Sequence, residues 1–273
     1  MLSHFSSSRV WTITLFELAR LFASKRGLIV LAAFSCLWFL IFTYIIGSAA
    51  EFITSESFKA LAQQAFGKLN LLALLEWELP ELSVYWIISA YLLPTFAILF
   101  SCDQTCSDRE RGTLRFILLR TSRPELLYGR FLGQVLILAI LIFITLIASL
   151  LFSLLNEQTV SFGSLSLSFS ILLKLIIISL PFIAGMTLIN VFVKSAKMSL
   201  IVYFLIYIGS AIIINLMTRF VMDLSFLFYL FPGEQIESVV GFESNYVNNY
   251  IIPLTQTVVY LALAQFIFKR SSL

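Results

Sequence analysis

Charged residues are scarce in this sequence of 273 residues, because only 12% are Asp, Glu, Lys or Arg, against about 25% in an ordinary soluble domain. Hydrophobic residues make up 60% of the chain. The 18 basic and 15 acidic side chains are too few to form the polar shell that a water-soluble core of this size requires. A soluble globular protein is therefore excluded, and the chain must be surrounded by lipid. The net charge of +3 is too small to indicate a nucleic-acid partner.

Residues and motifs that support catalysis or metal binding are also missing. The single histidine, His4, excludes His-based metal clusters and argues against a histidine-activated nucleophile. The phosphate-binding pattern G-x-x-x-x-G-K-[ST] does not occur, so we expect no ATP hydrolysis by this chain itself. Three cysteines make no disulfide framework, and we expect reduced thiols. The sequence thus predicts a protein that is not an enzyme and that holds no metal or cofactor.

Long apolar runs predict an all-α integral membrane protein. Runs of 18 or more residues are long enough to cross the hydrocarbon core as helices, and the chain contains six of them. The predicted spans are residues 28–50, 84–102, 131–155, 169–193, 198–216 and 251–268. Lys174 is the only charged residue within these runs. We expect it to reach the headgroups from near the outer end of the fourth span, the alternative being contact with an anionic substrate.

The distribution of lysine and arginine predicts the orientation. Fourteen of the 18 basic residues lie before the first span, after the second or fourth span, or at the end of the chain. The opposite side holds only Lys59, Lys68 and Arg219, together with 10 of the 15 acidic residues. Because positively charged loops stay in the cytoplasm, both termini are predicted to be cytoplasmic.

Three shorter segments are predicted to lie along the membrane surface. In residues 1–27, an apolar stripe at helical spacing indicates an amphipathic helix on the inner surface, formed by Trp11, Leu15, Leu18 and Phe22, with Glu17 and Arg20 on another face. The alternative is that this segment is only a positive flank that sets the topology. On the outer side, we expect an interfacial helix over 58–73 and a short re-entrant or interfacial helix over 220–231.

The loop 103–130, between the second and third spans, is the one densely polar segment, with six arginines and four acids in 28 residues. Two capping boxes are predicted, one from Ser107 and Glu110 and one from Ser122 and Glu125. A short helix over 113–120 would place three apolar side chains on one side and arginines away from it. Such a helix suits docking in a groove of a soluble partner. The alternative is that the arginines only enforce topology and bind anionic lipid.

The residues of this loop resemble a known family. Glu110-Arg111-Gly112-Thr113-Leu114, a leucine-rich helix and then Ser122-Arg123 resemble the loop after the second span in permeases of type-2 ABC (ATP-binding cassette) exporters. The likeness extends over the whole chain. It includes the surface helix, the six spans and the broken apolar stretch before the last span.

The resemblance implies that the loop helix is a coupling helix that contacts a separate cytoplasmic ABC ATPase, where ATP and Mg²⁺ would bind. Carried over by position, the residues at this contact are Arg109, Glu110, Arg111, Gly112, Thr113, Leu114 and Arg115. Glycine would permit close approach of the two backbones, and the charged residues could make charge-assisted hydrogen bonds. The resemblance also implies a second permease, identical or related, and short outer helices before the last span.

The leading hypothesis is a single permease domain over residues 1–273 that couples ATP hydrolysis by its partner to export across a bacterial inner membrane. In the alternative hypothesis, the chain acts mechanically on an envelope or periplasmic partner through the outer segments 51–83 and 217–249, and no substrate passes. A third hypothesis, an intramembrane enzyme or ion-driven carrier, requires ionisable residues deep in the spans, and Lys174 alone is a poor candidate set. The sequence does not identify a substrate.

Overall fold

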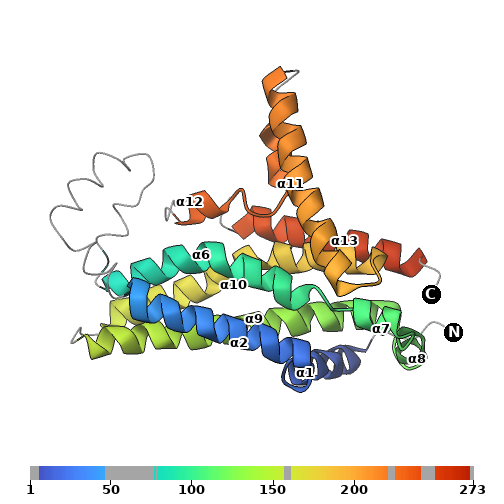
Figure 1. Cartoon of the computed structure of the whole chain (residues 1–273), viewed down its shortest axis with the longest axis horizontal. Helices are drawn as coiled ribbons and strands as arrows, with labels where there is room; N and C mark the ends of the chain where they lie inside the picture. Colours follow the sequence, from blue (N-terminus) through green and yellow to red (C-terminus); the bar gives the residue numbers. More distant parts are fainter. Residues whose placement is uncertain are drawn as a thin grey trace.

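The computed structural model describes residues 6–46, 77, 79–156, 161–220, 225–240 and 250–270. Within these ranges the chain is helical and contains no strand. Figure 1 shows long helices lying side by side, with one further long helix standing across them. The predicted all-α membrane fold is confirmed.

Six described helices are long and apolar enough to cross a membrane, as predicted. They are α2 (Lys25–Leu40) with its π-helical continuation η1 (Ile41–Ile46), α6 (Pro80–Ser101), α9 (Arg123–Leu155), α10 (Phe162–Phe192), α11 (Ala196–Phe220) and α13 (Ile252–Arg270). Several begin before the predicted apolar run, because helix formation continues into a polar first turn that hydropathy does not detect. In α10, for example, the Ser161 side chain caps the helix by accepting a hydrogen bond from the backbone N–H of Ser164.

The early start of α10 changes the position of Lys174. This residue lies well inside the helix, it is only 8% exposed, and its ammonium nitrogen is 5.9 Å from the ring centre of Trp86. The prediction that Lys174 extends to the headgroups is therefore wrong. Its side chain packs inside the bundle, where the face of an aromatic ring attracts a cation.

Two long helices, α9 and α10, form the centre of the bundle. The N-terminal helix α1 (Ser7–Ala23) lies along α9, α13 lies along α10, and α6 packs against both central helices. Gly129 of α9 lets α1 approach closely, because a Cβ at this position would lie 2.8 Å from the Ile13 side chain. By contrast, α11 projects away from the bundle (Figure 1) and leaves most of its apolar residues exposed.

The two ends of the described chain meet at the end of the bundle that carries the loop between α6 and α9. The backbone N–H of Ser6 donates a hydrogen bond to Glu125, with a distance of 2.8 Å to Oε1. The guanidinium of Arg123 donates to the carbonyl oxygens of Phe268 and Lys269. These contacts hold the start of α1, the start of α9 and the end of α13 together (Figure 1).

Helix α1 has a second, buried face besides the single apolar face that the sequence predicts. Trp11, Leu15 and Phe22 are exposed, as a helix on a membrane surface requires. A second face, formed by Val10, Thr14, Glu17 and Leu21, is buried against the protein. Glu17 therefore points into the protein, whereas the sequence pattern placed it only on a face away from the lipid.

At the opposite end of the bundle, short helices precede α13. A 3-10 helix η2 (Ser225–Leu230) and the short helix α12 (Ile236–Val240) lie where the sequence predicts a broken apolar stretch. The indole N–H of Trp86 donates to the carbonyl oxygen of Val240 over 3.1 Å, which ties α12 to α6. The interfacial helix predicted over 58–73 lies outside the described residues.

Candidate functional site

Two short helices form the loop between α6 and α9. Helix α7 (Cys106–Glu110) is followed by a turn and then by α8 (Leu114–Leu118), so a short helix exists where the sequence predicts one over 113–120. Apolar side chains of α8 pack against the core, and Leu114 is only 2% exposed. Its arginine, Arg115, is exposed. The predicted apolar side is confirmed, but the opposite side is not purely basic, because Phe116 and Leu119 are 72% and 82% exposed there.

Only one of the two predicted capping boxes forms. Ser122 and Glu125 make the reciprocal side-chain to backbone hydrogen bonds of a capping box at the start of α9. The box predicted from Ser107 and Glu110 is wrong, because α7 begins before Ser107 and ends at Glu110. Instead, the backbone N–H of Ser107 donates to the Asp103 carboxylate over 2.9 Å.

The loop tip, residues 109–115, lies at the surface of the protein. Glu110, Arg111, Gly112 and Thr113 are exposed, and the next apolar residue, Phe116, is 72% exposed. Arg109 is partly buried, and its guanidinium donates to the carbonyl oxygen of Val191 at the end of α10. The tip thus presents charged and polar groups outward from a base that is held by the rest of the protein.

Gly112 makes the turn between α7 and α8. Its φ is +71°, a left-handed conformation that glycine adopts without the steric cost that a Cβ imposes. Its backbone N–H donates to the carbonyl oxygen of Arg109 over 3.2 Å and closes the end of α7. A Cβ at this position would meet no atom of the chain within 4 Å. The turn itself therefore explains the glycine, and the surface beside it is open to a partner.

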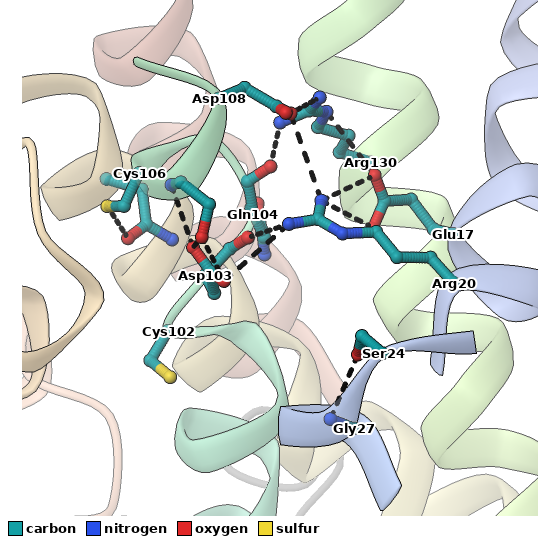
Figure 2. A network of polar contacts seen from close by, with 12 residues as sticks. Glu17, Arg20, Ser24, Gly27, Cys102, Asp103, Gln104, Cys106, Asp108 and Arg130 are labelled. Carbon is teal, nitrogen blue, oxygen red and sulfur yellow. Dashed lines mark hydrogen bonds and ion pairs between the residues drawn. The ribbon is translucent and has the colours of Figure 1, made fainter. Parts of the chain in front are cut away.

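A cluster of ion pairs lies behind the loop tip, between α1 and α9 (Figure 2). Glu17 of α1 lies 3.4 Å from Arg20 and 3.4 Å from Arg130 of α9. Arg130 also pairs with Asp108 of α7, and Arg20 lies 3.6 Å from Asp103. Glu17 is 4% exposed and Arg130 is 2% exposed. These five side chains, called the ionic cluster below, connect α1, α7, α9 and the residues that follow α6.

The two carboxylates beside Arg130 have opposite pKa shifts. Burial raises the pKa of the Glu17 carboxyl, and the charges of Arg130 and Arg20 offset this only in part. Burial also acts to raise the pKa of the less buried Asp108, but the charge and hydrogen bond of Arg130, together with Arg20, outweigh it and lower this pKa. Asp108 is therefore the firmly ionised partner of Arg130, and Glu17 is the carboxyl that protonates more readily.

On its other side the loop is tied to α10 and α11 through Asn190. The Asn190 side chain donates to the carbonyl oxygen of Ser101 at the end of α6 over 2.7 Å. Its Oδ1 accepts hydrogen bonds from Ser199 of α11 over 2.6 Å and from the free thiol of Cys106 over 3.1 Å. Burial raises the pKa of the Cys106 thiol to about 11, so the thiol stays a neutral donor.

Sequence reasoning did not identify the ionic cluster. The sequence pattern placed Glu17 on the polar face of a surface helix, and it placed Asp108 and Arg130 in the charged loop 103–130. One signal was present: Val10, Thr14, Glu17 and Leu21 repeat at helical spacing and form a second face of α1. Only the packing of α1 on α9 indicates that this face is buried.

Comparison with protein families identifies the family of this chain. A family model described as ABC-2 family transporter protein matches residues 11–273. The chain belongs to the ABC-2 transporter family. A search of curated proteins gave no match.

Membership of the ABC-2 family fixes the general role of the chain. ABC-2 permeases are membrane subunits of ABC transporters, so this chain is a multi-pass permease subunit that associates with an ABC ATPase. Such permeases are generally not catalytic themselves, which agrees with the missing phosphate-binding pattern. The resemblance inferred from the loop residues is therefore confirmed.

Proposed function

We propose that this ABC-2 permease couples ATP hydrolysis by its ATPase to substrate export across a bacterial inner membrane, and that the loop tip is the ATPase contact. The observation that carries the proposal is the contrast between an exposed tip and a firmly held base. Charged and polar residues of the tip face outward, whereas its flanks are joined to α1, α9, α10 and α11.

The held base makes mechanical coupling possible. A force on the tip reaches α1 and α9 through Asp108 and Arg130. It reaches α10 through Arg109 and Val191, and α11 through Cys106 and Asn190. Because packed helices move as rigid elements, a displacement of the ATPase would shift several spans together rather than bend a flexible loop.

The proposed topology has the loop tip, the start of α1 and the end of α13 in the cytoplasm. The excess of lysine and arginine at this end of the bundle supports this orientation. A second permease, identical or related, completes the transporter. The exposed apolar side chains of α11 support the presence of this second subunit, because a helix that stands away from its own bundle has surface available for a neighbouring subunit.

Co-purification tests the contact. The tagged full-length chain is isolated in mild detergent from its native membranes, and the ABC ATPase that accompanies it is identified by mass spectrometry and then co-expressed. Glu110→Lys reverses a charge at the exposed tip, and we expect at least about a tenfold loss of complex. Gly112→Arg places a large side chain on the same surface and should act in the same direction.

Glu234→Lys is the matched control, since Glu234 is also an exposed glutamate but lies at the opposite end of the bundle. It should leave the amount of complex unchanged. Complex formation that is equal for Glu110→Lys, Gly112→Arg and the control would refute the proposed contact, as would the absence of any co-purifying ATPase.

A further inference from the structure

A basic cavity lies beside the loop tip. It has a volume of about 630 Å³, which is within the range of small-molecule sites. Its walls come from α8, the start of α9, the last turn of α13 and the first turns of α1. These segments are far apart in the sequence and meet only at this end of the bundle.

Five cationic side chains line the cavity. They are Arg9, Arg115, Arg120, Arg123 and Lys269. No Asp or Glu is among the described residues that line it. One arginine has a structural task as well, because Arg123 donates to two carbonyl oxygens of the last turn of α13 and so holds that wall in place. Arg9 lies 3.7 Å from Glu125, and the positive charge of the remaining side chains makes the cavity suited to a compact anion.

One wall of the cavity is apolar. It is formed by Leu118 of α8, Leu127 of α9 and Phe268 of α13, together with neighbouring leucines. A free inorganic anion gains nothing from such a wall. An amphiphile does, because its anionic head can face the arginines while the start of its hydrocarbon part covers the leucines.

The position of the cavity relative to the bilayer favours the same ligand. Helix α13 runs from Ile252 to Arg270 and has 19 residues. At about 1.5 Å per residue it is about 28 Å long, close to the roughly 30 Å of a hydrocarbon core. If α13 spans the core, its last turn, which forms one wall of the cavity, lies at the level of the lipid headgroups.

We propose that this cavity binds the phosphate headgroup of an anionic phospholipid. The site adds a lipid ligand to the end of the bundle from which the loop tip projects. The proposal depends on α9 and α13 crossing the membrane and does not depend on the ATPase contact.

The test uses the full-length chain in an uncharged detergent and follows the fluorescence anisotropy of labelled phosphatidylglycerol. Arg120→Gln with Lys269→Gln removes two exposed charges of the cavity. Each basic residue near a phosphate-bearing surface contributes about fivefold in affinity. We therefore expect the double variant to bind the labelled lipid about 25-fold more weakly. Lys194→Gln with Lys197→Gln removes two exposed charges next to the loop but outside the cavity, and should bind within about twofold of the wild type.

Competition separates the possible ligands. Unlabelled phosphatidylglycerol should displace the probe, whereas phosphatidylcholine and inorganic phosphate at the same concentrations should not. Displacement by inorganic phosphate would overturn the assignment to a lipid, and equal displacement by phosphatidylcholine would overturn the requirement for a net negative headgroup. An equal loss of affinity in the two double variants would show attraction by the whole basic surface and would overturn the cavity as the site. Both variants change exposed side chains, and an unchanged unfolding temperature serves as the check on folding.

Discussion

Removal of Arg130 is the sharpest test of the ionic cluster. Arg130 is 2% exposed and pairs with Glu17 and Asp108, and its guanidinium also donates to the carbonyl oxygen of Gln104. The substitution Arg130→Met keeps a long side chain in the same space but removes the charge and the donors. It leaves Glu17 buried with Arg20 as its remaining cationic partner.

The expected cost is large because a buried charge loses its partner. Removal of one member of a buried ion pair typically costs about 3–5 kcal/mol. Asp108 adds little to this figure, since it is partly exposed and water compensates for the lost pair. For comparison, Arg111→Met changes an exposed arginine of the same loop and should alter the free energy of unfolding by at most about 0.5 kcal/mol.

The Glu17 carboxyl makes this cost depend on pH. Burial already raises the pKa of Glu17, and loss of the Arg130 charge must raise it further. A carboxyl whose pKa is higher in the folded state binds its proton more tightly there, so folding is favoured as the pH falls. As the pH falls from 7.5 toward the ordinary carboxyl pKa of 4.5, the stability of Arg130→Met relative to the wild type should recover, with a slope of at most about 1.4 kcal/mol per pH unit.

Equilibrium unfolding by steric trapping in neutral bicelles measures these free energies. A double-mutant cycle adds Glu17→Gln. We expect the variant with both substitutions to be about 0.5–3 kcal/mol more stable than the sum of the two single effects implies. The reasoning fails if Arg130→Met costs no more than Arg111→Met, or if the two effects at Glu17 and Arg130 are additive.

Two further predictions concern glycines. Gly129→Ala should destabilise the protein by about 1–3 kcal/mol, because its Cβ would lie 2.8 Å from an α1 side chain. Gly209→Ala is the control, since Gly209 lies in open space within α11, and it should stabilise the protein by up to about 1 kcal/mol. Equal unfolding free energies for the two variants would refute the close approach of α1 to α9. At Gly112, where φ is +71°, substitution by alanine should lower the free energy of unfolding by about 1–2 kcal/mol, and substitution by asparagine should lower it clearly less. A smaller loss for alanine than for asparagine would contradict the left-handed turn.

The helix starts in the loop show what local sequence can and cannot predict. The Ser122 and Glu125 pattern correctly predicts a capping box because Pro124 lies in the first turn, where it favours a helix start, and a long apolar helix follows the box. The Ser107 and Glu110 pattern has the same spacing but fails. Asp103 accepts the hydrogen bond from Ser107 instead, and α7 is too short for a capping residue to decide its ends.

Local sequence determined the number of spans, the all-α class, the loop tip and the family resemblance. Each depends on chain-local quantities, namely the length of apolar runs, the sign of the flanking charges and the spacing of a short motif. The family match over residues 11–273 supports the same assignment.

The tertiary structure alone decided which charges act together. Glu17, Asp108 and Arg130 come from three separate segments and form one cluster in which Glu17 and Arg130 are buried, and Arg9 and Lys269 meet Arg120 around one cavity. No periodicity or spacing contains this information, because the effect of a charge depends on burial and on the distance to its partners. Both quantities appear only when α1, α9 and α13 are packed at the same end of the bundle.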